Sequence, residues 1–142
     1  MIASLIAGTV LTILTIGIHS SCTMGWLGFL RSRESNIINR RFGNFLTLSS
    51  TAIALLLTHT LEVTLWATAY FWLVGTKVFD SFESAVYFST VTFTSLGYGD
   101  IVIDGRWRLL SAFQALTGIL ILGWSTALLF TVVQSIMKRK FE

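Results

Sequence analysis

The chain has 142 residues, of which 54% are hydrophobic and only 12% are charged, whereas soluble domains carry roughly 25% charged residues. Together with a mean hydropathy of +0.74, this excludes an ordinary soluble globule and indicates an integral membrane protein. The net charge is only +3, and the basic residues lie in short clusters beside apolar stretches. Membrane topology therefore explains them better than nucleic-acid binding, and we expect no nucleic acid among the partners.

Three stretches of 20 or more residues contain no Asp, Glu, Lys or Arg: 1–30, 42–61 and 109–137. A helix needs about 20 residues to cross a bilayer, so each stretch is long enough. We expect an all-α integral membrane protein with three transmembrane helices.

The first element, 1–30, is predicted to be an N-terminal transmembrane helix. A cleaved signal peptide is the alternative, but the apolar run lacks a preceding basic region and the residues around His19 to Cys22 form a poor cleavage site. His19 and Cys22 are three residues apart, yet two ligands do not fill a zinc site. We interpret both as core residues.

Two basic segments follow apolar spans, the loop 31–44 with four Arg and the tail 138–142. The positive-inside rule makes both cytoplasmic, which places the N-terminus outside and the C-terminus in the cytoplasm. Membrane lipids with anionic headgroups are possible partners of both segments.

The second span, 45–74, carries aromatic residues near its predicted outer end: Trp66, Tyr70 and Trp72. Such residues are typical of the interfacial aromatic belt of membrane proteins. We expect these three side chains to lie at the membrane surface.

The same span contains His59 and Glu62, three residues apart on one helical face. Counting 1.5 Å per residue from Arg41 places Glu62 about 30 Å along the helix, near the outer edge of the hydrocarbon. One interpretation is a structural brace or a snorkelling carboxylate. The other is a pH-sensitive contact with the following short helix, since histidine titrates near physiological pH.

The region 79–104 is too short and too polar for another crossing and is typical of a re-entrant hairpin. Asp80 and Glu83 have the spacing of a capping box, which predicts a short helix that ends near Thr94. Gly97 and Gly99 then permit conformations that would let backbone carbonyls point one way. Non-helical backbone at membrane depth requires burial in protein or an aqueous path, and carbonyl rings can replace the hydration shell of an ion.

The run Thr92-Phe93-Thr94-Ser95-Leu96-Gly97-Tyr98-Gly99-Asp100 resembles the T-x-x-T-V-G-Y-G-D signature of the potassium channel superfamily. The resemblance covers roughly residues 46–134 and is greatest to small prokaryotic two-span pore proteins, with one extra N-terminal helix. It implies a pore domain over 45–137, made of an outer helix 45–74, a pore helix 81–94, a selectivity filter 95–100 and an inner helix 107–137.

The resemblance also implies the site residues. Potassium would be coordinated at the filter, by backbone carbonyls and the Ser95 hydroxyl, with these candidate residues: Ser95, Leu96, Gly97, Tyr98 and Gly99. Asp100 would flank the outer mouth, and Thr92 and Thr94 would support the pore helix. A homotetramer is implied by the family and by cyclic closure of identical subunits.

Two filter residues depart from the signature, because Ser95 replaces Thr and Leu96 replaces Val. Neither change removes a carbonyl ligand, but the Leu96 side chain must pack behind the filter, and both changes could loosen it. In the inner helix, Gly118 and Gly123 are candidate gating hinges, and tight helix packing is the other interpretation.

The sequence thus predicts a potassium-selective channel that conducts passively in a membrane, expected to be a prokaryotic plasma membrane. We expect no enzyme activity, no cofactor and no metal other than the permeant K⁺, because no nucleophile set or metal-ligand cluster stands out. The alternatives are a weakly selective cation channel and a non-conducting membrane subunit or scaffold.

Overall fold

The computed structural model describes residues 1–33 and 40–141 of the chain. Residues 34–39 of the predicted basic loop and the last residue of the basic tail lie outside this part. The described residues form helices and no strand: α1 (Ile2–Arg33), α2 (Arg40–Leu73), α3 (Phe82–Phe93), the 3-10 turn η2 (Gly105–Trp107) and α4 (Arg108–Phe141). The predicted all-α class is therefore confirmed.

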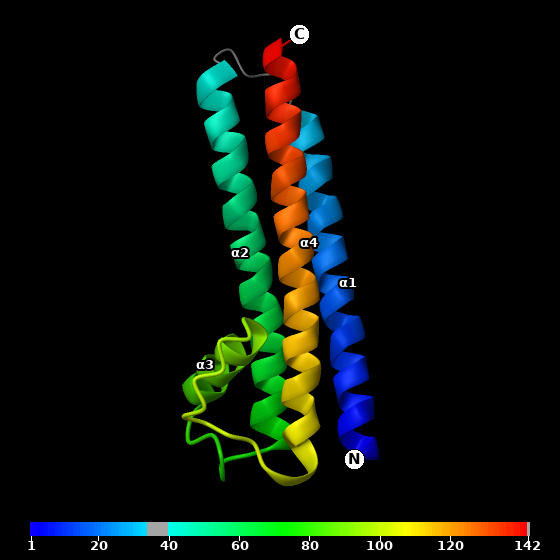
Figure 1. Cartoon of the computed structure of the whole chain (residues 1–142), viewed down its shortest axis with the longest axis vertical. Helices are drawn as coiled ribbons and strands as arrows, with labels where there is room; N and C mark the ends of the chain where they lie inside the picture. The colour runs from blue at the N-terminus through cyan, green and yellow to red at the C-terminus, as the bar shows by residue number, and fades with distance from the viewer. Residues whose placement is uncertain (34–39, 142) are drawn as a thin grey trace.

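The three long helices run side by side, and the short α3 lies against α2 and α4 near the end of the bundle that holds the N-terminus (Figure 1). Helix α1 packs against α4 and α2. Three segments are long and apolar enough to cross a membrane: Ile2–Ser32, Gly43–Leu73 and Gly105–Lys138. The three predicted spans are thus present as helices.

Helix α3 begins one residue later than the predicted capping box would place it. Ser81, in an extended conformation, is the N-cap: its Oγ accepts a hydrogen bond from the Ser84 N–H (3.1 Å), and Ser84 Oγ accepts one from the Ser81 N–H (3.5 Å). The prediction of Asp80 and Glu83 as the capping pair is wrong. The cap must be the residue whose side chain faces the free N–H groups of the first turn, and the chain places Ser81 there.

The aromatic residues predicted for the membrane surface divide into two groups. Trp66 and Tyr70 are fully buried, whereas Trp72 is 79% exposed. Trp66 Nε1 donates to Thr15 Oγ1 of α1 (2.9 Å), so a facing helix satisfies its polar tip. A buried Trp needs such a partner. The belt assignment is therefore wrong for Trp66 and Tyr70, which belong to the core.

Helices α1 and α4 approach closely where α1 carries a glycine. A Cβ at Gly8 would lie 2.6 Å from the Phe113 ring of α4. One turn further along, the hydroxyls of Thr12 and Thr117 are hydrogen bonded at 2.8 Å. Small and hydroxyl-bearing residues at such a contact are typical of helix packing in membranes.

Candidate functional site

A buried polar network holds α3 between α2 and α4. The Tyr70 hydroxyl of α2 donates to Gln114 Oε1 of α4 (2.8 Å), and Gln114 Nε2 donates to Ser89 Oγ of α3 (2.7 Å). The Ser89 hydroxyl in turn donates to the Val63 carbonyl (2.8 Å). The three side chains are fully buried. Each is hydrogen bonded, as buried polar groups require.

The sequence pattern singled out neither Ser89 nor Gln114, and it predicted Tyr70 at the membrane surface. The available signal was Gln114 itself, an amide inside a charge-free stretch, since a polar side chain within a span needs a partner or an aqueous surface. Its partners lie on two other elements and could not be named from the sequence.

The backbone of α4 touches the last residue of α3. A Cβ at Gly118 would overlap the Phe93 carbonyl oxygen and lie 2.8 Å from the Phe93 carbonyl carbon. Tight packing is therefore a sufficient reason for glycine at position 118. Gly123 has nothing within 4 Å of such a Cβ. A hinge at either glycine stays a prediction.

Helix α3 ends in a Schellman motif centred on Ser95. The Leu96 N–H donates to the Val91 carbonyl (3.0 Å), and the Ser95 N–H donates to the Thr92 carbonyl (3.0 Å). Ser95 has a φ of 59°, the left-handed conformation that this motif normally gives to glycine. It is the only non-glycine residue with positive φ in the described part of the chain.

Left-handed residues alternate along the segment that follows. Ser95, Gly97 and Gly99 have φ values of 59°, 58° and 79°, while Leu96 and Tyr98 between them do not have positive φ. When right- and left-handed residues alternate, successive peptide groups take similar orientations, so that their equivalent atoms point to one side of the chain. The side chains of Leu96 and Tyr98 are 57% and 66% exposed. The Leu96 side chain was expected to pack behind the filter, but residues of its own chain leave more than half of it exposed.

The predicted flanking residues lie beside an open groove of about 670 Å³ between α3, residues 95–103 and α4. Thr92 and Asp100 line this groove. The Asp100 carboxylate raises the pKa of the exposed Tyr87 phenol above its ordinary value. The Thr94 hydroxyl donates back to the Thr90 carbonyl of its own helix (2.9 Å), so its contact within the chain is local.

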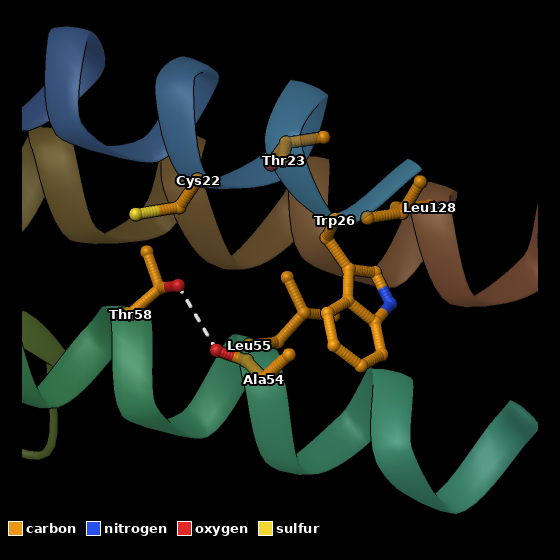
Figure 2. Close-up of a pocket in the computed structure, with 7 residues that line it drawn as sticks. All are labelled: Cys22, Thr23, Trp26, Ala54, Leu55, Thr58 and Leu128. Carbon is orange, nitrogen blue, oxygen red and sulfur yellow. Dashed lines mark hydrogen bonds between the residues drawn. The ribbon is translucent and has the colours of Figure 1, made fainter. Parts of the chain in front are cut away.

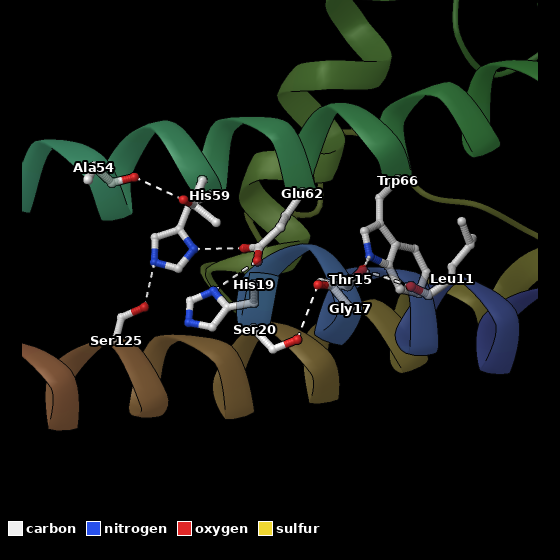
Figure 3. Close-up of polar contacts among 11 residues, drawn as sticks. Leu11, Thr15, Gly17, His19, Ser20, Ala54, His59, Glu62, Trp66 and Ser125 are labelled. Carbon is white, nitrogen blue, oxygen red and sulfur yellow. Dashed lines mark hydrogen bonds and ion pairs between the residues drawn. The ribbon is translucent and has the colours of Figure 1, made fainter. Parts of the chain in front are cut away.

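A second polar cluster lies in the middle of the bundle, where three helices converge (Figure 3). His19 Nδ1 of α1 is 3.0 Å from Glu62 Oε1, and His59 Nδ1 is 2.8 Å from Glu62 Oε2. His59 Nε2 is 3.0 Å from Ser125 Oγ of α4. The side chains of His19 and Glu62 are fully buried and that of His59 is 15% exposed.

The burial of Glu62 decides between a structural brace and a snorkelling carboxylate. Its side chain is fully buried and its carboxylate meets His19 of α1, so it does not snorkel. Its depth in the bilayer stays a prediction. Its contacts are those of a structural brace. The brace partner that the sequence missed is His19.

Cys22 is separate from this cluster. Together with Thr23 and Thr58, it lines a small cavity of about 10 Å³ between α1, α2 and α4 (Figure 2). Thr23 Oγ1 is buried and has no hydrogen-bond partner among the described residues. The His19 and Cys22 pair considered from the sequence therefore does not form a shared site.

The model of a protein family described as Ion channel matches residues 58–135, which is more than half of the chain. The matched range contains most of α2's second half, α3, segment 95–100 and most of α4, and it excludes α1. No curated protein and no solved structure matches the chain.

Proposed function

The chain belongs to the ion channel family, and from this premise we propose that it conducts potassium passively through the backbone carbonyls of residues 95–99. The observation that carries the proposal is the alternation of left-handed residues at Ser95, Gly97 and Gly99. This pattern supports successive peptide groups on one side of the chain, as a carbonyl pathway requires. The GYGD sequence at 97–100 supports potassium as the ion.

The short helix α3 supplies an electrostatic contribution. It ends at Phe93, directly before this segment. The C-terminal end of a helix carries partial negative charge, which favours a cation over an anion. Carbonyl oxygens can then replace the water that a potassium ion loses on entry.

The proposed assembly is a homotetramer. One chain supplies one carbonyl segment, and a ring of carbonyls needs several segments around an axis. The exposure of Leu96 and Tyr98 and the open groove beside them are consistent with a surface that neighbouring copies cover. Four identical copies close by cyclic symmetry. We place the N-terminus outside and the C-terminus in the cytoplasm of a plasma membrane, from the basic segments.

The test is ion flux from liposomes that contain the purified protein, with potassium or sodium as the permeant ion. We expect potassium flux that Gly97→Ala abolishes, since a residue with a Cβ resists the φ of 58° by roughly 1–2 kcal/mol. Gly17→Ala is the matched control, because Gly17 lies in α1 outside the family match and its Cβ would meet nothing within 4 Å. Cross-linking should show four chains for all three proteins.

Other results would favour the alternatives. Equal potassium and sodium flux would indicate a weakly selective cation channel, to which the replacements at Ser95 and Leu96 would contribute. A monomer or dimer without flux would indicate a non-conducting membrane subunit.

A further inference from the structure

The cluster of His19, His59 and Glu62 has features that a brace does not require. Its ligand-type atoms, one from each residue, all lie within 4.8 Å of one another. His19 comes from α1, while His59 and Glu62 come from α2, so the set is assembled only when these helices pack (Figure 3). The cluster is remote from segment 95–100 in the sequence. It offers imidazole nitrogens and a carboxylate, whereas that segment offers backbone carbonyls.

The donor chemistry selects a class of ion. Two imidazoles and one carboxylate form a His₂Glu set, a combination that binds zinc with a fourth position left for water. Imidazole suits zinc and its transition-metal neighbours, whereas potassium, magnesium and calcium prefer oxygen ligands. The permeant ion proposed above therefore does not account for this cluster.

The spacing is close to that of a coordination set. Zinc lies about 2.0–2.2 Å from nitrogen and oxygen donors. Tetrahedral ligands at that range are separated by roughly 3.4 Å. The observed contacts of Glu62 are 3.0 Å to His19 Nδ1 and 2.8 Å to His59 Nδ1. Small side-chain rotations would therefore allow the three donors to converge on one ion.

The charge of Glu62 is balanced only by histidine. No Lys or Arg forms an ion pair with it among the described residues, and its side chain is fully buried. A buried carboxylate is costly without a positive partner. A divalent cation or a protonated imidazole would supply that charge, and the two possibilities are separable by experiment.

Neighbouring residues orient the His59 ring, whereas one nitrogen of the His19 ring has no hydrogen-bond partner among the described residues. His59 Nε2 is 3.0 Å from Ser125 Oγ, a contact that turns Nδ1 toward the carboxylate in the way that outer hydrogen bonds orient metal-binding histidines. His19 Nε2 is buried and has no hydrogen-bond partner among the described residues. Hydrogen bonding within the chain thus leaves the His19 ring incompletely satisfied.

We propose that His19, His59 and Glu62 bind a divalent transition-metal ion, with zinc as the ion that the donor set favours. The ion would link α1, which lies outside the family match, to the α2 residues within it. The inference stands on this cluster alone and does not depend on potassium conduction.

The experiment measures zinc uptake by the purified full chain in detergent, using equilibrium dialysis, and repeats it with cobalt(II) as a spectroscopic probe. We expect one ion per chain and the visible absorption of tetrahedral cobalt. His19→Phe keeps a ring of similar size and removes both nitrogens, and Glu62→Gln keeps the side-chain shape and removes the charge. Each should weaken binding by more than about 100-fold, the upper end of the loss seen when only an outer-shell partner is removed.

Two further variants act as controls. Cys22→Ser should bind as the wild type does, because Cys22 lines the neighbouring cavity and is not among the three ligands. Ser125→Ala should weaken binding by about 10-fold if its contact orients His59.

Several results would overturn the proposal. Absence of stoichiometric uptake by the wild type would do so whether or not the variants fold. Uptake that survives in His19→Phe and Glu62→Gln would place the ion elsewhere. A thermal stability that responds to pH but not to zinc would indicate that a protonated imidazole, and not a metal ion, balances the charge of Glu62.

Discussion

The polar network around Gln114 and the segment 95–100 are neighbours in the fold, yet they differ in where their partners lie. The network is closed within one chain: Tyr70, Gln114 and Ser89 are fully buried, and each has a hydrogen-bond partner. The segment is open, with the side chains of Leu96 and Tyr98 more than half exposed. The chain therefore completes the support of α3 by itself.

This difference separates residues that act through side-chain contacts from residues that act through their backbone conformation. The support depends on side chains that must meet across helices, so any change there alters the stability of a single chain. The segment depends on backbone conformation, and its proposed role needs other copies. Mutations should therefore divide into those that unfold the chain and those that change the segment alone.

The largest effect is expected at the junction of the two regions. Gly118→Ala introduces a Cβ that overlaps the Phe93 carbonyl, and overpacking of this kind costs about 1–3 kcal/mol. Because the clash is with backbone, we expect a loss near 3 kcal/mol, measured by thermal unfolding in detergent. Gly123→Ala, with an unobstructed Cβ, should be neutral or slightly stabilising. Equal stability of the two variants would contradict the close contact.

Removing the centre of the network should have the next largest effect. Gln114→Leu leaves the Tyr70 hydroxyl and the Ser89 hydroxyl without their amide partner, and an unsatisfied buried polar group costs about 1–3 kcal/mol. Gln134→Leu changes an exposed residue of the same helix and should leave the unfolding temperature unchanged. A similar drop for both would show that the network is not the cause.

A smaller effect of opposite sign is expected within the segment. Ser95→Gly removes the Cβ that opposes the φ of 59°, and this should stabilise the chain by about 1 kcal/mol. Ser95→Thr restores the signature residue but places a β-branched side chain at positive φ, so it should destabilise. Thermal unfolding of the two variants should move in opposite directions. A stabilising Thr would mean that residue 95 takes a different conformation in the assembly.

The smallest effect concerns Tyr87, which is exposed and is influenced by the Asp100 carboxylate. Its pKa is raised above the ordinary value of 10.0, so the folded chain holds this proton more tightly than the unfolded chain does. The resulting stability is present below pH 10 and is lost as the pH rises through the folded-state pKa. Tyr87→Phe should therefore unfold with a weaker pH dependence above pH 10 than the wild type. An identical alkaline decline would remove Tyr87 as its source.

The positions of the helices could be predicted from the sequence better than the contacts between their side chains. The spans follow from charge-free stretches, and the short helix follows from the polar break between them. Which residues face each other could not be predicted, because a span that is apolar on all sides has little periodicity to show its buried face. His19 thus looked like an ordinary core residue, and Trp66 and Tyr70 looked like surface aromatics, until the packing of α1 and α4 against α2 supplied their partners. The capping box erred by one residue for a local reason, since serine and aspartate both suit an N-cap.

The contact between Gly118 and Phe93 also has a mechanical meaning. No side chain lies between the α4 backbone and the carbonyl that ends α3, so nothing compressible is present to absorb a displacement. Packed protein interiors transmit strain because they have low compressibility. A movement of α4 at this level is therefore passed to the start of segment 95–100 with little loss. We therefore expect the helix and the start of the segment to move together at this point.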